Sequence, residues 1–113
     1  MLPSSNPAPA WRFTMHAGLC QKDCHGLVWS FGFREAFDFL KSAFSREGIK
    51  GFNIQQCTGV WDGVEEESIV VTLVSFSPYD DRLKFERVAL AYKMHFKQEA
   101  VLVTAEVTRA KLI

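Results

Sequence analysis

The sequence lacks an excess of charge of either sign. Thirteen basic residues balance thirteen acidic ones in a chain of 113 residues. Proteins that bind nucleic acid or an anionic membrane through a general electrostatic field are usually strongly basic. The longest apolar runs also fall well short of the roughly 18 to 20 residues that a membrane-spanning helix needs. We therefore expect neither nucleic acid nor a membrane among the direct partners.

Cysteine is scarce as well, with three residues, and three of the four prolines fall within the first ten residues. An odd number of cysteines without an export signal argues against a disulfide framework and favours a reducing cytoplasm. The first ten residues lack the basic start and the apolar run of such a signal. We expect residues 1–10 to be a flexible leader and residues 11–113 to fold as a single cytoplasmic domain.

The sequence is rich in hydrophobic residues, which make up 48% of it and include ten Phe. Its periodicity changes along the chain between the two-residue period of strands and the three- to four-residue spacing of helices. The predicted elements are a strand over 11–19, a helix over 30–48 capped by Ser30, a hairpin over 52–76 that turns at Asp62-Gly63, a helix over 77–97 capped by Ser77 at Pro78, and a strand over 100–107. The pattern lapses between Cys20 and Trp29, where we expect a loop.

The order strand, helix, strand, strand, helix, strand is typical of the α+β class. It predicts the ferredoxin-like βαββαβ arrangement, a four-stranded antiparallel sheet with both helices on one face. In this arrangement the first and third strands are central. The apolar run over 69–76 fits a central strand, and the polar residues within 52–61 fit an edge strand.

The second half of the chain also carries short motifs. These are Gly59-Val-Trp61 with Gly63, Glu67-Ser68 at the entry to an apolar strand, and Tyr92-x-x-x-Phe96-x-Gln98-Glu99-x-Val101 at the last junction. This set resembles a group of small bacterial and phage proteins that has no established function. The resemblance implies the same fold and an accessory role in phages or mobile elements.

Thiol and imidazole groups gather in the first third of the chain. Cys20, Cys24 and His25, with Cys57 and His16 from elsewhere, are candidates for a zinc site, because thiolate and imidazole are zinc ligands. The spacing is not that of a zinc knuckle, and loop cysteines without a metal are the alternative. A Cys nucleophile with a His base is a further hypothesis, but neither an orienting group nor an oxyanion site is visible. No motif indicates a cofactor.

Three further positions are candidates for binding. Trp61, beside a glycine at the hairpin end, either pins the turn or anchors a binding surface. Gln98 and Glu99 can bind a ligand, although satisfying backbone groups freed at the end of a helix is the preferred interpretation. The acidic residues 65–67 either bind a cation or form a solvated hairpin tip that discourages edge pairing, and the second is favoured.

The face of the sheet without helices is predicted to carry polar candidates for binding, Arg12, His16 and Gln55, beside apolar residues such as Val70 and Leu102. Apolar side chains of this size are usually covered. We therefore predict a homodimer or higher homo-oligomer, with another protein as the alternative.

Two functions follow as hypotheses. The first is a non-enzymatic interaction module that inhibits or sequesters a host defence protein or a small signalling molecule. The second is a small-molecule enzyme that uses a pocket between sheet and helices with His or Cys groups.

Overall fold

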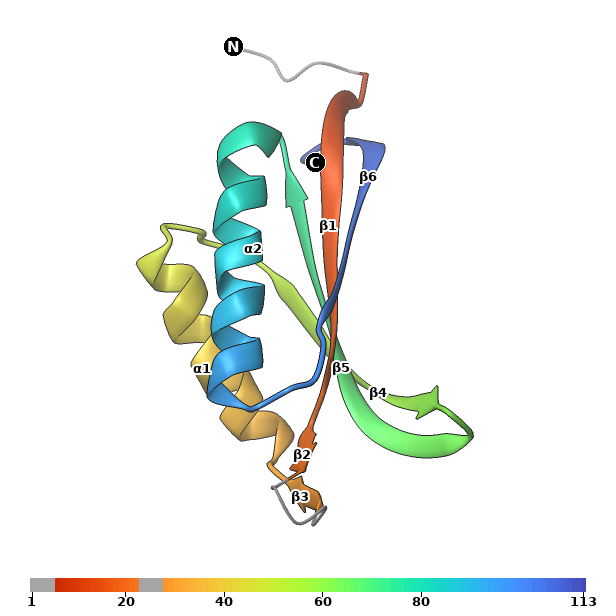
Figure 1. Ribbon diagram of the computed structural model, residues 1–113. Coiled ribbons are helices and arrows are strands. Elements are labelled where there is room, and N and C mark those ends of the chain that lie inside the picture. The colour runs from red at the N-terminus through yellow and green to blue at the C-terminus, as the bar shows by residue number, and fades with distance from the viewer. Residues whose placement is uncertain (1–5, 23–27) are drawn as a thin grey trace.

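The computed structural model describes residues 6–22 and 28–113, with the side chains of all these residues except 21, 22, 28 and 61. One antiparallel sheet holds β1 (Ala8–Gly18), β4 (Asn53–Trp61), β5 (Val64–Ser75) and β6 (Leu102–Ala110) in the order β4-β5-β1-β6. The helices α1 (Phe33–Arg46) and α2 (Pro78–His95) lie on one face of this sheet (Figure 1). The predicted ferredoxin-like βαββαβ fold is thus confirmed, with β1 and β5 in the centre.

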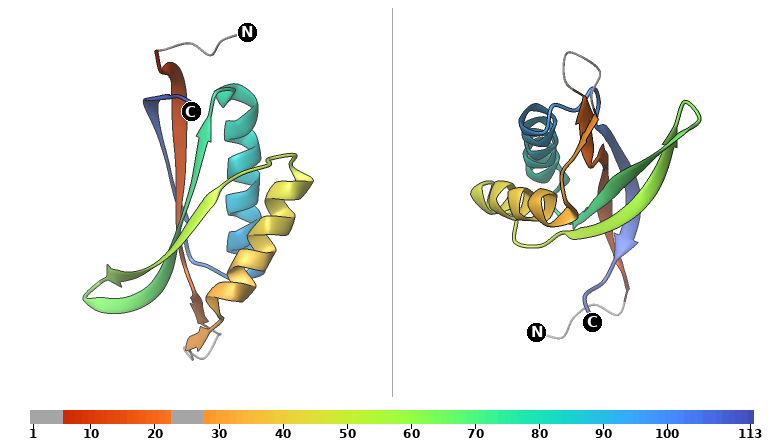
Figure 2. Two further views of the ribbon diagram at one scale, coloured as in Figure 1. Left: turned by 180° about the vertical axis from the view of Figure 1, so that it is seen from behind. Right: turned by 90° about the horizontal axis from the view of Figure 1, so that it is seen from below.

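The β4–β5 hairpin turns where the sequence predicts it. Asp62 and Gly63 have φ angles of 50° and 75°. A two-residue turn of type I′ needs positive φ at both positions, and its twist matches that of the two strands. The far end of the hairpin extends beyond the helices, as both views in Figure 2 show. Within the described ranges 6–22 and 28–113, therefore, no helix packs on either side of its outer part.

The core is built from the alternating residues of β1 and β5 and the inner faces of the helices. Ile69 and Val71 in β5 and Met15 in β1 are fully buried. Aromatic rings fill the space between the layers, where Phe13, Phe44, Phe85 and Tyr92 are at most 1% exposed. This two-layer packing leaves the other face of the sheet uncovered (Figure 2).

The start of α1 differs from the prediction, whereas α2 begins at Pro78 after Ser77 as predicted and differs only in its hydrogen bonds. Ser30 does not cap α1, because it is the last residue of a short strand and the helix begins at Phe33 after Gly32. Ser77 occupies the cap position of α2, but its side chain makes no capping hydrogen bond. The buried Ser75 hydroxyl replaces it, accepting the Ser77 N–H at 3.0 Å and donating to the Asp81 carboxylate at 2.6 Å.

Three predicted boundaries also change. The segment expected to be a loop contains a ribbon of two short strands, β2 (Cys20–Lys22) and β3 (Val28–Ser30). Strand β1 begins at Ala8, inside the expected leader, because residues 8–10 pair with residues 108–110. For the same reason β6 runs from Leu102 to Ala110, later than predicted. No helix in residues 6–22 and 28–113 is long and apolar enough to cross a membrane.

Candidate functional site

The candidate site lies at the end of β1, where side chains from the C-terminal part of the chain bind the backbone of Gly18. The Tyr92 hydroxyl of α2 donates to the Gly18 carbonyl at 2.7 Å. The Gly18 N–H donates to Oε1 of Gln98 at 3.2 Å. The pairing of β1 with β6 ends at His16 and Leu102. At Gly18, two residues further along β1, the side chains of Tyr92 and Gln98 therefore take the place of a β6 backbone. We call Gly18, Tyr92 and Gln98 the clamp.

Gln98 uses its whole amide group in this position. Besides accepting from Gly18, it donates through Nε2 to the Cys20 carbonyl at 2.8 Å and to the Phe96 carbonyl at 3.1 Å. The local backbone places it there, because Lys97 has a φ of 52° and the Gln98 N–H bonds the Lys93 carbonyl, which is a Schellman-type helix end. Gln98 is therefore held in place and ties the end of α2 to the β1–β2 segment.

Burial determines the protonation state of Tyr92. It raises the pKa of the Tyr92 hydroxyl above its ordinary value, and the neighbouring Cys20 adds a smaller effect in the same direction. A buried phenol resists ionisation because the charged form loses its hydration. Tyr92 therefore remains a hydrogen-bond donor throughout the physiological pH range.

The clamp adjoins the acidic entry to β5. Gly18 pairs with Ser68 across the ladder, and the next N–H, that of Leu19, donates to the Glu67 carbonyl at 2.9 Å. The exposed Glu67 carboxylate accepts a hydrogen bond from Gln56 on β4 at 3.1 Å. Consequently, the Glu67-Ser68 and Gln98-Glu99 motifs, far apart in sequence, flank the end of β1 from its two sides.

Gly59 in β4 explains part of the Gly-x-Trp motif. A Cβ at this position would lie 3.0 Å from the Ser68 hydroxyl. The glycine thus leaves room for Ser68 across the hairpin. Trp61 ends β4 opposite Val64, and its side chain is outside the described part of the structure, so its binding role stays a prediction.

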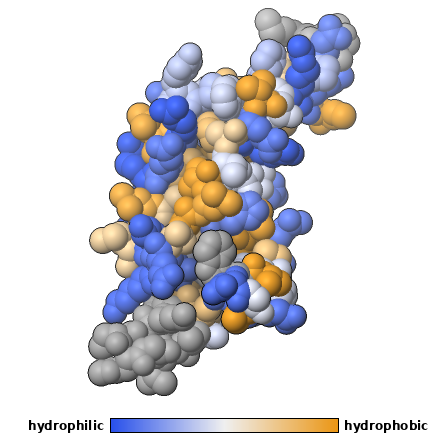
Figure 3. All heavy atoms as spheres, turned by 45° about the vertical axis from the view of Figure 1, so that its right-hand side comes forward, coloured by the Kyte–Doolittle hydropathy of each residue, from blue (hydrophilic) through white to orange (hydrophobic). Residues whose placement is uncertain are grey.

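The polar candidates on the uncovered face are brought together only in part. Gln55 and His16 share one row of the sheet on either side of Val70, with Leu102 next to His16. Arg12 lies four residues before His16 along β1. Its guanidinium donates to the Glu106 carboxylate at 2.7 and 2.9 Å. Figure 3 brings forward the side of the molecule that carries β6, where apolar patches alternate with hydrophilic side chains. This face is mixed in character.

The remaining candidates from the sequence are the zinc-ligand residues and Glu99. Cys24 and His25 lie outside the described residues, and Cys20 is half-buried at the start of β2. Within residues 6–22 and 28–113, no group of three or more His, Cys, Asp or Glu side chains is arranged to hold a metal ion. Glu99 is exposed immediately after Gln98.

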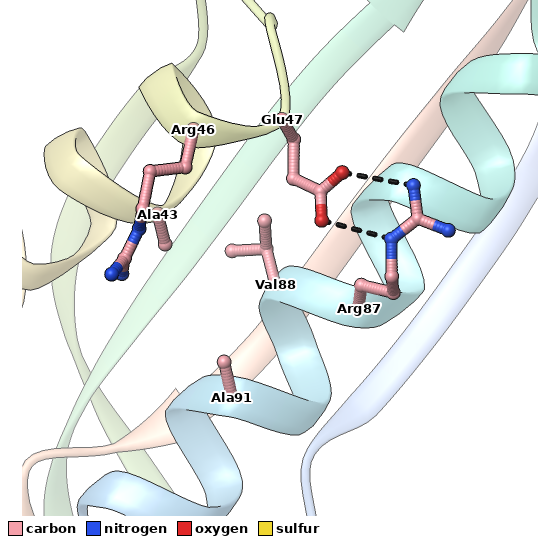
Figure 4. A pocket seen from close by; sticks show the side chains of 6 residues that line it. All are labelled: Ala43, Arg46, Glu47, Arg87, Val88 and Ala91. Carbon is pink, nitrogen blue, oxygen red and sulfur yellow. Dashed lines mark hydrogen bonds and ion pairs between the residues drawn. The ribbon is translucent and has the colours of Figure 1, made fainter.

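Two surface hollows lie on the helices and not between sheet and helices. One of them, of about 300 Å³, separates the end of α1 from α2. Figure 4 shows Glu47 and Arg87 joined across it by two hydrogen bonds of 2.8 Å. This ion pair lowers the pKa of Glu47, chiefly through the hydrogen bond from Arg87. Both groups are bound to each other, so the hollow offers little to a ligand.

The sequence reasoning missed Tyr92 and Gly18 as parts of the site. From the sequence, Tyr92 is named only within the motif at the last junction and is given no part in a site. The signal that could have identified it was its presence in the motif with Gln98.

Neither a protein-family model nor a curated protein sequence matches the chain. Solved structures do match in fold. A phage SAM lyase in complex with S-methyl-5′-thioadenosine is 16% identical, with a TM-score of 0.65 over 99% of this chain and 97% of the lyase. A putative PII-like signalling protein from Thermus thermophilus is 19% identical, with a TM-score of 0.56 over 91% and 89%. CPII from Thiomonas intermedia, bound to ADP, AMP and bicarbonate, is 11% identical, with a TM-score of 0.54 over 94% and 97%.

Proposed function

We propose that this protein binds S-adenosylmethionine and cleaves it, releasing S-methyl-5′-thioadenosine. The observation that carries the proposal is that Glu67-Ser68 and Gln98-Glu99 flank the same end of β1, each bonded or paired to the backbone of Gly18 or Leu19. The proposal is supported by the likeness of the fold to a phage SAM lyase along 99% of this chain. Two of the neighbours hold adenine compounds, S-methyl-5′-thioadenosine in one and ADP and AMP in the other.

The substrate requires negative charge from the protein. S-adenosylmethionine carries a positive sulfonium and a positive ammonium group beside one carboxylate. Glu67 and Glu99 are exposed carboxylates at this end of the sheet, and no strongly basic group is bonded to either among the described residues. Carboxylates bind such cations best where water is excluded. We infer that they hold the amino-acid part of the substrate.

The reaction balances within the substrate. S-methyl-5′-thioadenosine keeps the methyl and adenosyl groups on sulfur, so the bond that breaks joins sulfur to the amino-acid chain. Its electron pair stays on sulfur, and the carboxylate oxygen of the same molecule forms the new bond to the released carbon. One positive and one negative charge cancel, and the protein's task is to fold the substrate so that these atoms meet.

A second copy of the chain would complete the site. Among residues 6–22 and 28–113, no element covers the open sheet face or the outer hairpin. Exposed carboxylates such as Glu67 and Glu99 also bind a small cation weakly in water. A homo-oligomer packed through this face would exclude water from the acidic end. Removing or sequestering a small molecule needed by a host defence would suit the phage accessory role that the sequence motifs imply.

The test uses the purified full chain with S-adenosylmethionine. We expect Glu67→Gln and Glu99→Gln to lower kcat/KM about tenfold to a hundredfold, the range for losing a charged hydrogen-bond partner. Glu35→Gln, an exposed acid in the first turn of α1, serves as the control and should leave turnover unchanged. Equal turnover by all three variants and the wild type would contradict the assignment of Glu67 and Glu99 to the substrate site.

The second candidate is a non-enzymatic binding module, which the likeness to nucleotide-bound CPII favours. Such a module would bind an adenine nucleotide, or a host protein through the open face, without converting it. Calorimetry with ADP, AMP and S-adenosylmethionine separates the two candidates. Stoichiometric nucleotide binding without turnover supports the module, whereas turnover supports the enzyme.

A further inference from the structure

We propose that Tyr92 and Gln98 are positioning residues that hold the acidic entry to β5 in its working geometry without touching the substrate. This inference rests on the proposed function for its catalytic part and on the hydrogen bonds of the clamp for its structural part.

The first step concerns the end of the sheet. The N–H and C=O of one strand residue point to the same side, and at Gly18 both point away from β5, toward the side on which β6 has stopped pairing. These groups are half-buried, and without partners they would cost free energy. Oε1 of Gln98 and the hydroxyl of Tyr92 supply the acceptor and the donor that a neighbouring strand would otherwise provide.

Gln98 acts here as a substitute for a peptide group. Its amide accepts from the Gly18 N–H and donates to the Cys20 carbonyl, two residues further along the same edge. A backbone peptide offers the same acceptor and donor to a neighbouring strand. A side chain therefore extends the ladder by two residues after the real strand has left it.

The second step leads from the clamp to the acidic residues. The segment held between Gly18 and Cys20 contains Leu19, whose N–H donates to the Glu67 carbonyl at 2.9 Å. Leu19 is 2% exposed, so the segment is also fixed by packing. A shift of this segment would move the backbone of Glu67 and Ser68, where β5 leaves the cover of the helices. The clamp thus controls the position of Glu67 through one buried link.

The third step excludes a direct role. Tyr92 is fully buried, and its hydroxyl is bonded to Gly18. The Gln98 amide has three partners, all of them backbone groups. Neither group is available to a ligand in this arrangement. An effect of either residue on the reaction must therefore pass through the backbone that it holds.

The experiment compares Tyr92→Phe and Gln98→Met with Tyr79→Phe, which removes the same hydroxyl from a tyrosine that is 91% exposed on the same helix. At a temperature where all variants are folded, we expect kcat to fall about tenfold in the first two while KM changes less than about twofold, because misalignment affects the reacting geometry more than the contacts. A lower melting temperature with unchanged kcat would overturn the positioning role.

A second measurement does not depend on the reaction. Amide hydrogen exchange of Leu19 should become at least about tenfold faster in Tyr92→Phe and Gln98→Met and stay unchanged in Tyr79→Phe, because the clamp limits local opening. Unchanged exchange in the two clamp variants would overturn the clamp even if the enzyme is active. Faster exchange in these variants, together with a wild-type protein that shows no turnover, would keep the clamp and reject the proposed function.

Discussion

Gly18 is the residue at which the clamp is most sensitive to a small change. A Cβ at this position would lie 2.8 Å from Oε1 of Gln98, which is closer than real contacts allow. We expect Gly18→Ala to reduce the free energy of unfolding by about 1 to 3 kcal/mol, the usual cost of overpacking. Urea unfolding measures this, with Gly51→Ala as the control because a Cβ there meets nothing within 4 Å. Equal free energies of unfolding for the two variants would contradict this prediction, because they would show that Gln98 can move aside without loss of stability.

Tyr92 gives the protein a specific response to alkaline pH. An unfolded tyrosine ionises near pH 10, whereas burial raises the pKa of the folded Tyr92 above that value. Between these two pKa values, Tyr92 has lost its proton in the unfolded chain and keeps it in the folded chain. The contribution of Tyr92 to stability is therefore complete below about pH 10 and is lost as the pH rises beyond it. The free energy of unfolding should therefore fall more between about pH 8 and pH 11 in wild type than in Tyr92→Phe. An equal alkaline loss in both proteins would contradict this.

Residues of the hairpin turn and the helix faces were predictable from sequence because their causes are local. Asp62-Gly63 specifies its turn within two residues, and the apolar spacing of α1 is complete within that one helix. The contact between Tyr92 and Gly18 spans 74 positions of the chain and has no local pattern. Only the motif that joins Tyr92 to Gln98 pointed to it.

At the scale of elements, the start of α2 depends on Ser75 and not on the serine in the cap position. Ser75 is 2% exposed and bonds both the Ser77 N–H and the Asp81 carboxylate. Its replacement by Ala leaves these groups unpaired, so we expect a loss of about 1 to 3 kcal/mol. Ser77→Ala should change stability by less than about 0.5 kcal/mol, as at ordinary surface positions. If thermal unfolding gave the larger loss for Ser77→Ala, the capping role would belong to Ser77.

The same helix shows why the sequence predicted the capping hydroxyl at Ser77 and not at Ser75. Ser77-Pro78 has the composition of a helix start, and Pro78 does begin α2. A hydroxyl two residues earlier is normally part of the preceding strand. Because β5 ends at Ser75 with its side chain on the buried face, that hydroxyl turns toward the helix instead.

At the scale of the whole molecule, the uncovered sheet face predicts self-association. Leu102 on this face is 60% exposed. Leu90 on α2 is 58% exposed, so a substitution there serves as the matched control. If copies pack through the sheet, Leu102→Lys should lower the mass measured by light scattering toward that of one chain, since a buried unpaired charge is costly. Leu90→Lys should not change the mass. A wild-type monomer at micromolar concentration would refute the prediction.

The proposed function is tested most directly by incubating the purified protein with S-adenosylmethionine and separating the adenosyl products by chromatography with mass detection. The proposed reaction predicts S-methyl-5′-thioadenosine, formed in proportion to the protein added and reduced in Glu67→Gln. Recovery of unchanged S-adenosylmethionine after repeated incubation with folded wild-type protein would contradict it.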